Sequence, residues 1–314
     1  MKYIKKSIII LTAVIGFFLI FSTKNEVQAK TVSHSEEIST QMLEKVRASK
    51  LKVIATPQVK VKTDPNEQDI SKYYYNQLKH EISRNTYNTL VTELKNDIVV
   101  SISNYEYSID ESTEEKVTEC FNNNIVPYVL DGYEAYIMDG AKNYWWTPDG
   151  IKIGYKDATL LDDKVIFKYV EIASPVQEWS NYDDFNTKLK QVSNSITGKT
   201  TYEIVRAINY YICNNVDYTI IDDTDIEQTA YGALILNKAV CEGQTQLFNL
   251  LCREKGIISI NVYGYTSTTS TTTAHAWNYV YEPKKKQWYA VDVTWNNQFD
   301  DILYLMIGSQ TEIN

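Results

Sequence analysis

Apolar residues along the chain repeat first at helical and then at strand intervals. From residue 70 they recur about every four positions, which places them on one helix face; they are Ile70, Tyr74, Leu78, Ile82, Leu90 and Leu94. A short strand is expected over 98–102. A second helix is predicted to begin at Ser112, because Ser112 and Glu115 have the spacing of a capping box, and to stop by Pro127. The polar residues 30–68 are expected to form a short helix over 36–48 and then a loose linker.

Strand-like segments follow at 144–147, 151–155 and 165–172, with turns at 148–150 and 161–163. The segment 174–182 contains a proline and is the predicted domain boundary. Two helices come next, one around 184–195 and one opened by a second capping box, Thr200 to Glu203. These patterns predict an α+β protein with two domains. Residues 30–180 form a mainly helical N-terminal region with a few strands, of no assigned family, and residues 181–314 form a second domain.

The first 29 residues have the three-part layout of a secretory signal peptide. Three lysines precede an apolar run over 8–21, and Val27-Gln-Ala29 offers a small-residue cleavage site. The apolar run is shorter than the roughly 18–20 residues that a spanning helix needs. We therefore expect a secreted or cell-surface protein with no stable transmembrane anchor.

The net charge of −9 includes the four Lys and one Glu of residues 1–29, so the remaining chain carries −12. Such a charge argues against nucleic acid as a partner, because nucleic acid binding rewards Lys and Arg. The acidic cluster at 222–227 lacks the glycine and the distal glutamate of an EF-hand loop. It is interpreted as a solvated turn in which Asp225 caps the next helix. No metal and no cofactor are expected.

Four cysteines are present, and none forms a C-x-x-C pair of the kind found in zinc and redox motifs. Cys120, Cys213 and Cys252 fit apolar helix positions and are expected to be buried free thiols, although spacing alone leaves a disulfide among them open. Cys241 differs, because it precedes a helical pattern that ends at Gly256. Unsatisfied N–H groups at that helix end favour a thiolate and can also stabilise an oxyanion. Gly243 leaves room for a close approach by backbone or substrate.

Two strand patterns, 275–281 and 288–295, flank a polar turn and predict a hairpin. Folded about Pro283 and Lys284, the hairpin places His275 directly opposite Asp292 on one sheet face. A slip of one residue would move Asp292 to the other face. The Thr- and Ser-rich run 266–273, just before His275, is expected to be a flexible loop. Thiolate, imidazole and carboxylate together suit nucleophilic attack on an amide carbonyl.

Three segments resemble the motifs of the bacterial transglutaminase-like superfamily: Ala239–Gly243, His275–Asn278 and Trp288–Trp295. The resemblance spans about 202–308. It implies a papain-like α+β core in which a helix-borne Cys241 packs against an antiparallel sheet bearing His275 and Asp292. It also implies an oxyanion donor upstream of the cysteine, for which Tyr231 is the candidate. Gly243, Trp277 and Asn278 are expected to position substrate or the oxyanion, and no calcium site is implied.

Within this resemblance the expected reaction joins a Gln side chain to a Lys amine through a thioester on Cys241. Hydrolysis by a peptidase or a deamidase uses the same acyl-enzyme with water as acceptor, and the sequence does not choose between them. A surface binding or adhesion module with a vestigial triad is a further alternative. The expected partners are proteins or peptides that bear Gln and Lys. Physiological substrate and oligomeric state are left open.

Overall fold

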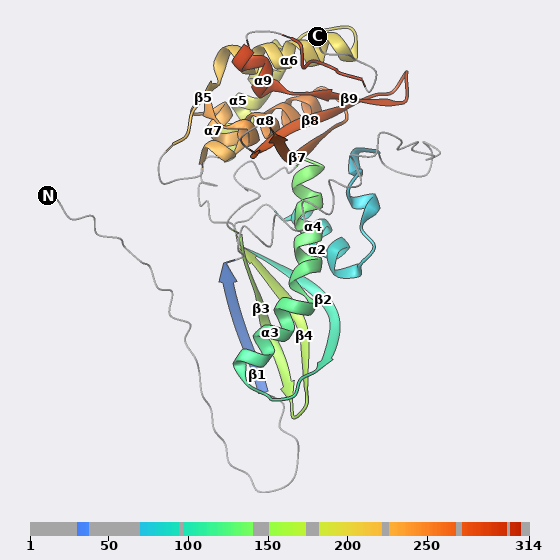
Figure 1. Ribbon diagram of the computed structural model, residues 1–314, viewed down its shortest axis with the longest axis vertical. Helices are drawn as coiled ribbons and strands as arrows, with labels where there is room; N and C mark the ends of the chain where they lie inside the picture. Colours follow the sequence, from blue (N-terminus) through green and yellow to red (C-terminus); the bar gives the residue numbers. More distant parts are fainter. Residues whose placement is uncertain are drawn as a thin grey trace, which may run out of the picture.

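A computed structural model describes residues 30–37, 70–93, 97–140, 151–173, 182–221, 226–267, 272–299 and 302–308. Figure 1 shows two parts, a lower sheet with one helix across it and an upper part in which several helices surround a second sheet. Helices α2 and α4 lie between them. Both sheets of three or more strands are antiparallel. The fold is thus the mixed α+β fold that the sequence predicts.

The lower sheet has the strand order β1-β3-β4-β2. Its strands are β1 (Lys30–Glu37), β2 (Asp97–Ser108), β3 (Lys152–Leu161) and β4 (Lys164–Ala173). Three helices accompany it: α2 (Glu81–Thr92), α3 (Glu114–Asn124) and α4 (Val126–Met138). Phe121 of α3 packs on Tyr155 of β3 and Phe167 of β4, at ring distances of 5.1 and 5.4 Å. This aromatic contact fixes α3 on the sheet.

Strand β1 corrects part of the helix predicted over 36–48. Residues 36 and 37 pair with Ile153 and Lys152, because the unpaired edge of β3 offers this polar segment backbone partners that a short isolated helix lacks. Strand β2 is also longer than the predicted 98–102, and a bulge between Ser101 and Tyr105 interrupts its pairing. The N-terminal region therefore contains the sheet β1-β3-β4-β2, whereas only a few strands were expected there.

The helix predicted from Ile70 begins later than its apolar spacing suggests. Two 3-10 turns, Ile70–Lys72 and Tyr75–Gln77, precede α2. The carboxylate of Asp139 accepts hydrogen bonds from the backbone N–H groups of Tyr74 and Tyr75 at 2.8 and 3.0 Å. These two N–H groups therefore bond to a side chain from a distant part of the sequence and not to helix carbonyls. The segment consequently forms two short turns beside the end of α4.

The start of α3 is one residue from the predicted cap. Thr113 is the N-cap, and its hydroxyl accepts from the N–H of Lys116 at 3.3 Å. Ser112 instead donates to the carbonyls of Leu161 and Asp162 at the β3–β4 turn. As predicted, α3 ends before Pro127, which lies in the first turn of α4.

Several predictions lie outside the described residues. They are the signal peptide at 1–29, the rest of the 36–48 helix and its linker, Leu94, the strand 144–147 with the turn 148–150, nearly all of the boundary 174–182, and the acidic residues 222–225. Where the chain is described, the turn at 161–163 and the helices near 184–195 and after Thr200 are confirmed.

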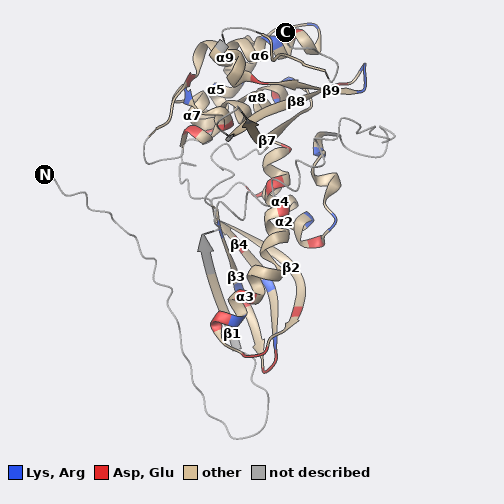
Figure 2. Ribbon diagram, viewed as in Figure 1, with Lys and Arg blue, Asp and Glu red and all other residues tan. Residues whose placement is uncertain are grey.

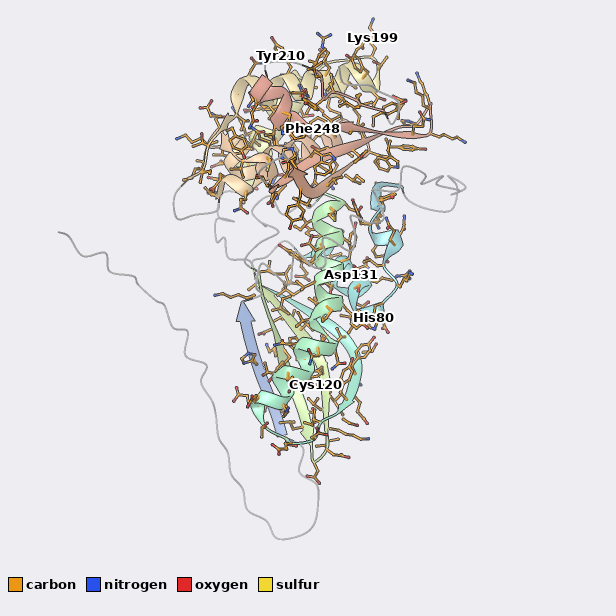
Figure 3. The ribbon with its side chains drawn as sticks, viewed as in Figure 1. His80, Cys120, Asp131, Lys199, Tyr210 and Phe248 are labelled. Carbon is orange, nitrogen blue, oxygen red and sulfur yellow. The ribbon has the colours of Figure 1, made fainter. Side chains whose placement is uncertain are left out.

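The upper part contains five helices and two small sheets within the described residues. The helices are α5 (Tyr182–Ser195), α6 (Thr201–Asn215), α7 (Ala230–Leu234), α8 (Cys241–Glu254) and α9 (Val293–Phe299). The sheets are β7-β8-β9 (Ser259–Ser267, Thr272–Glu282, Gln287–Val291) and the parallel pair β5-β6 (Asp217–Tyr218, Lys238–Ala239). Helix α8 is central, with the fully buried Phe248 at its middle (Figure 3), and it packs on β7 and β8.

The Thr- and Ser-rich run 266–273 was predicted to be a loop, but both of its ends belong to strands. Thr266 pairs with Thr273 and Ser267 with Thr272 in the β7–β8 ladder. Cross-strand pairing therefore orders both ends of the run, since β-branched threonine suits a strand. The residues between them lie outside the described part.

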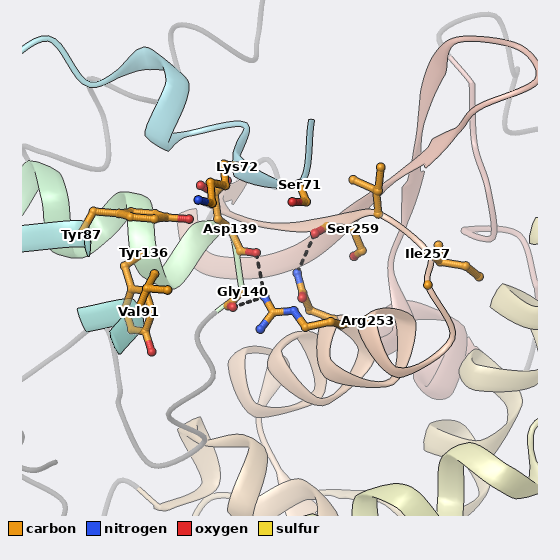
Figure 4. Close-up of a pocket in the computed structure, with 13 residues that line it drawn as sticks. Ser71, Lys72, Tyr87, Val91, Tyr136, Asp139, Gly140, Arg253, Ile257 and Ser259 are labelled. Carbon is orange, nitrogen blue, oxygen red and sulfur yellow. Dashed lines mark hydrogen bonds between the residues drawn. The ribbon is translucent and has the colours of Figure 1, made fainter. Parts of the chain in front are cut away.

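The two parts meet where α4 ends against α8 and β7. The side-chain amide of Asn261 donates to the carbonyl of Ile137 at 2.9 Å, and Arg253 donates to the carbonyls of Asp139 and Gly140. A cavity of about 360 Å³ lies beside this contact, with Tyr87 and Tyr136 on one side and Ser259 on the other (Figure 4). The end of α8 opposite Cys241 is thus held by the N-terminal region.

All four cysteines are free thiols. Cys120 lies on α3 in the lower part (Figure 3), whereas the other three belong to the upper part. Cys252 is fully buried, and burial raises the pKa of its thiol well above the ordinary range. Within the described ranges, every helix is too short or too polar to span a bilayer.

The crossing of α2 and α4 depends on Gly132. A Cβ at this position would lie 2.2 Å from the carbonyl oxygen of Ser83. We expect Gly132→Ala to lower the free energy of unfolding by about 1–3 kcal/mol, because the helices must move apart. Urea denaturation measures this change. Asn123→Ala, at an exposed position of α3, is the control and should change stability by less than about 0.5 kcal/mol; equal effects would contradict the packing argument.

Candidate active site

Cys241 is the first residue of α8, as its sequence position predicts. Its neighbour Val240 is the N-cap and provides no side-chain hydrogen bond. No capping side chain therefore accepts from the N–H groups of the first turn. These groups point toward the N-terminal end of the helix, where Cys241 lies. The thiol is partly buried. The parallel pair β5-β6 ends immediately before it and fixes the direction from which the chain enters α8.

Gly243 allows the first turn of α8 to pack tightly against another backbone segment. A Cβ at this residue would lie 2.4 Å from the carbonyl oxygen of Glu227 and 2.7 Å from that of Thr229. The N–H of Val240 also donates to the Glu227 carbonyl at 3.0 Å. The close approach expected at Gly243 is therefore made by the protein's own backbone, which holds the cysteine end of the helix in place.

His275 and Asp292 form a buried hydrogen bond, with 2.6 Å between Nε2 of the imidazole and Oδ2 of the carboxylate. The two residues are only 9% and 7% exposed. Their pairing differs from the predicted register. Asn278 lies opposite Val291, so the residue that faces Asp292 is Trp277. His275 lies two residues before Trp277 on β8 and is therefore the diagonal neighbour of Asp292. Because the shift is two residues, both side chains stay on the same sheet face.

The carboxylate of Asp292 is held from several directions. Its Oδ1 accepts from the backbone N–H of Trp295 at 3.0 Å, which leaves Oδ2 for the histidine. Its own N–H donates to the carbonyl of Tyr304 at 2.9 Å. Asp292 lies just beyond the end of β9 and just before α9. The strand thus sets its position, and the first turn of α9 sets its rotamer.

With Nε2 engaged by Asp292, Nδ1 is the nitrogen of His275 that remains for the thiol. His275 makes side-chain hydrogen bonds with both Asp292 and Cys241. Burial disfavours the charged imidazolium, but these two hydrogen bonds and the nearby negative charges outweigh it and raise the pKa of His275 from 6.5 to about 9. The environment therefore favours a protonated imidazole beside the cysteine.

A buried hydrogen bond also ties the cysteine helix to the aspartate turn. The hydroxyl of Thr294 donates to Oε1 of Gln244 at 2.7 Å. Gln244 is three residues beyond Cys241, and Thr294 is two beyond Asp292. Relative movement of α8 and α9 would break this bond, so it helps to keep the nucleophile and the carboxylate in register.

Tyr218 is a site residue that the sequence did not reveal. Its hydroxyl forms hydrogen bonds with both the side chain and the backbone of Cys241. The backbone bond favours the phenolate, so its donor is the cysteine N–H. Burial and then the charge of Cys241 raise the pKa of Tyr218. β5 has only two residues and gives no periodic signal; its pairing with β6 brings Tyr218 beside Ala239, two residues before the nucleophile.

The predicted oxyanion donor Tyr231 occupies another position. It is buried in α7, and its ring stacks on Phe185 at 6.4 Å. Among the described contacts, Tyr218 is the tyrosine that reaches Cys241. Tyr218 is therefore a second candidate for this role, and the role of Tyr231 stays a prediction.

Trp277 and Asn278 face opposite sides of β8. The ring of Trp277 stacks on that of His275 at 5.9 Å, and its side chain hydrogen-bonds with Tyr279. Asn278 is fully buried on the other face and donates to Asn261 Oδ1 at 3.0 Å and to the carbonyl of Thr245 at 3.2 Å. Trp277 thus borders the site, whereas Asn278 joins the sheet to α8.

A thiol, an imidazole, a carboxylate and a hydroxyl therefore meet at one end of α8. A thiol beside a carboxylate-oriented imidazole has the layout of a nucleophile activated by its base. The Tyr218 hydroxyl, held by the cysteine N–H, is a donor next to the thiol, where an oxyanion develops during acyl transfer. The described residues contain no group of three or more His, Cys, Asp or Glu side chains that could hold a metal ion.

This helix-on-sheet core brings a Cys, a His and an Asp together, an arrangement that is typical of cysteine-nucleophile domains. Residues 190–293 match the family described as the Transglutaminase-like superfamily. The matched range contains Cys241, His275 and Asp292. Residues 190–293 of this chain are therefore similar to the Transglutaminase-like superfamily.

Two curated relatives share sequence beyond that domain. Kyphoscoliosis peptidase from Homo sapiens is 30% identical over 193 residues, which covers 58% of this chain and 26% of the relative. Kyphoscoliosis peptidase from Mus musculus is 27% identical over 191 residues, covering 57% and 26%. The chain thus spans about a quarter of the length of these relatives.

Solved structures with partial similarity include a TGase, with a TM-score of 0.32 and 15% identity over 52% of this chain and 47% of that one. The periplasmic domain of TgpA from Pseudomonas aeruginosa aligns with a TM-score of 0.30 and 13% identity, covering 48% and 71%.

The raised pKa of His275 makes stability depend on pH. Its stabilising contribution is complete below the ordinary pKa of 6.5 and is lost as the pH rises through about 9. Relative to His275→Gln, the wild type should lose roughly 1–3 kcal/mol of unfolding free energy over this interval. Urea denaturation at both ends of the interval measures the loss. Asp292→Asn should reduce it, and a stability difference that does not change with pH would contradict the assignment.

Proposed function

We propose that the chain is a transglutaminase-like cysteine acyltransferase that joins a glutamine side chain of one protein to a lysine amine of another. The proposal rests above all on the His275–Asp292 bond beside a helix-terminal Cys241. A thiolate at this position is the attacking group, and the imidazole beside it carries the proton. The match to the Transglutaminase-like superfamily over 190–293 supports the same reaction class.

In the first half-reaction the sulfur of Cys241 attacks the carbonyl carbon of the glutamine amide, and the carbonyl π electrons move to oxygen. The Tyr218 hydroxyl, whose oxygen accepts from the Cys241 N–H, donates its own proton to that oxyanion. His275 then gives its proton to the amide nitrogen, the C–N bond breaks and ammonia leaves. The products are a thioester on Cys241 and a neutral imidazole, with Asp292 holding the ring throughout.

In the second half-reaction a lysine amine attacks the thioester carbon, and His275 takes the proton that the amine loses. The C–S bond breaks, an isopeptide bond forms, and the thiolate–imidazolium pair is restored. Water in place of the amine gives a carboxylic acid by the same steps. The acceptor is therefore selected by how the site admits an amine and excludes water, while Cys241, His275 and Asp292 serve either outcome.

A cysteine peptidase is the second candidate function, and similarity to the two relatives named Kyphoscoliosis peptidase favours it. A peptidase uses the same thiolate on a backbone amide and releases an amine segment. Deamidation of glutamine is the corresponding hydrolysis of a side chain. A binding module with a vestigial triad is less well supported, because each triad side chain is present and the histidine–aspartate bond is made.

We propose protein or peptide chains as substrates and a secreted or cell-surface location. The location rests on the layout of residues 1–29, and the exclusion of nucleic acid rests on the net charge of −12 for the remainder. Acidic and basic side chains are interspersed over both parts (Figure 2). A protein surface bearing Gln and Lys is therefore a more suitable partner than a polyanion.

The reaction itself is tested by offering the protein a Gln-containing protein and a labelled primary amine, followed by mass spectrometry. Incorporation of the amine at Gln is the expected result. Conversion of Gln to Glu would identify a deamidase, and chain cleavage a peptidase. Cys241→Ala should abolish any of these products. The absence of product with the wild-type protein and an unreactive Cys241 would overturn the proposal in favour of a binding module.

The role of Tyr218 is tested by Tyr218→Phe, which removes only the hydroxyl. We expect kcat to fall by roughly 100-fold, because one oxyanion donor is lost, with KM little changed. Alkylation of Cys241 by a small reagent should continue, since that reaction forms no oxyanion. Tyr210→Phe, at a 65% exposed position on α6, is the matched control. An unchanged kcat for Tyr218→Phe would remove Tyr218 from the oxyanion site.

A further inference from the structure

Trp295 contacts both partners of the buried histidine–aspartate bond. Its backbone N–H donates to Oδ1 of Asp292 at 3.0 Å, and its indole stacks on the imidazole of His275 with ring centroids 5.0 Å apart and an interplanar angle of 15°. The same residue therefore orients the carboxylate through its backbone and covers the base through its side chain.

The position of the indole is itself fixed. Tyr304 packs edge-on against it, with centroids 4.8 Å apart and an angle of 67°. The backbone of Tyr304 is held by two hydrogen bonds. Its N–H donates to the side-chain oxygen of Asn296, and its carbonyl accepts from the N–H of Asp292. Trp295 thus has a defined ring plane that a freely rotating surface side chain would lack.

A stacked indole affects the two protonation states of His275 differently. The electron-rich face of tryptophan attracts a cation more strongly than a neutral ring, by about 0.5–2 kcal/mol. The ring also shields the bond between His275 and Asp292 from water, which strengthens that bond. Both effects favour imidazolium over imidazole, and an imidazolium beside Cys241 favours the thiolate.

We infer that Trp295 is a positioning residue that stabilises the imidazolium of His275 and so maintains the thiolate of Cys241, beyond its packing role. The inference deepens the proposed function and rests on it. Among the described residues, the ionisable groups around His275 are Asp292 just before α9 and Cys241 on α8, with Tyr218 of β5 beyond the thiol. Trp295 acts on this set through its contacts with His275 and Asp292.

The test measures the rate of alkylation of Cys241 by iodoacetamide as a function of pH, which reports the thiolate without requiring a substrate. Trp295→Leu removes the aromatic face. We expect its rate at neutral pH to fall about 3- to 10-fold and its acid limb to move to higher pH, because the imidazolium is less stable. Trp295→Phe keeps a weaker aromatic face and should show a smaller shift in the same direction.

The matched control is Trp288→Leu. Trp288 is partly buried like Trp295, but its ring packs on Tyr73 and Tyr281 at 5.5 and 5.3 Å. Its loss should affect stability and leave the pH profile unchanged. If circular dichroism shows that the Trp295→Leu variant does not fold, Trp295→Met is used in its place, because methionine fills the space without an aromatic ring.

The two possible failures give different results. A wild-type thiol that reacts only above the ordinary cysteine pKa near 8.5 would overturn the proposed function. A wild-type thiol that reacts well below that pH, with superimposable profiles for folded Trp295→Leu or Trp295→Met, would overturn the role of Trp295 alone. NMR titration of His275 in the Cys241→Ala background provides the second measurement, and removing the indole should lower its pKa.

Discussion

The buried hydrogen bond between His275 and Asp292 is the interaction on which the organisation of the upper part depends. A carboxylate with 7% exposure needs partners that compensate for lost water. The histidine and the N–H of Trp295, in the first turn of α9, supply that compensation. Strand β8, strand β9 and α9 must all meet for this to happen, so the chemistry of the site and the topology of the sheet are set together.

Helix α8 extends this arrangement across the molecule. Its N-terminal end presents Cys241 to the histidine, and its C-terminal end places Arg253 against the last carbonyls of α4. Between these ends the helix is buried against β7 and β8. The N-terminal region therefore contacts the same helix that carries Cys241.

Several features could be predicted from sequence because each depends on residues close together along the chain. The helix that begins at Cys241 and ends at Gly256, whose φ is +71°, follows from local spacing and a glycine that tolerates the left-handed region. The hairpin follows from two alternating segments around a polar turn, although its second strand ends at Val291 and residues 293–295 of the predicted strand 288–295 belong to α9. Even with the register wrong by two residues, the face of Asp292 was predicted correctly, because strand side chains alternate with a period of two.

The sequence by itself determined the helix-borne cysteine, the identity of the three candidate catalytic side chains, and the sheet face that His275 and Asp292 share. Only the tertiary structure decided the contacts between distant segments. The side chain of Asp139 turns the start of the predicted first helix into two 3-10 turns, and the two-residue pair β5-β6 brings Tyr218 to Cys241. The physical reason is the same in both cases. A hydrogen bond between residues far apart in the chain leaves no periodicity in either segment, so it can be known only once the chain has folded.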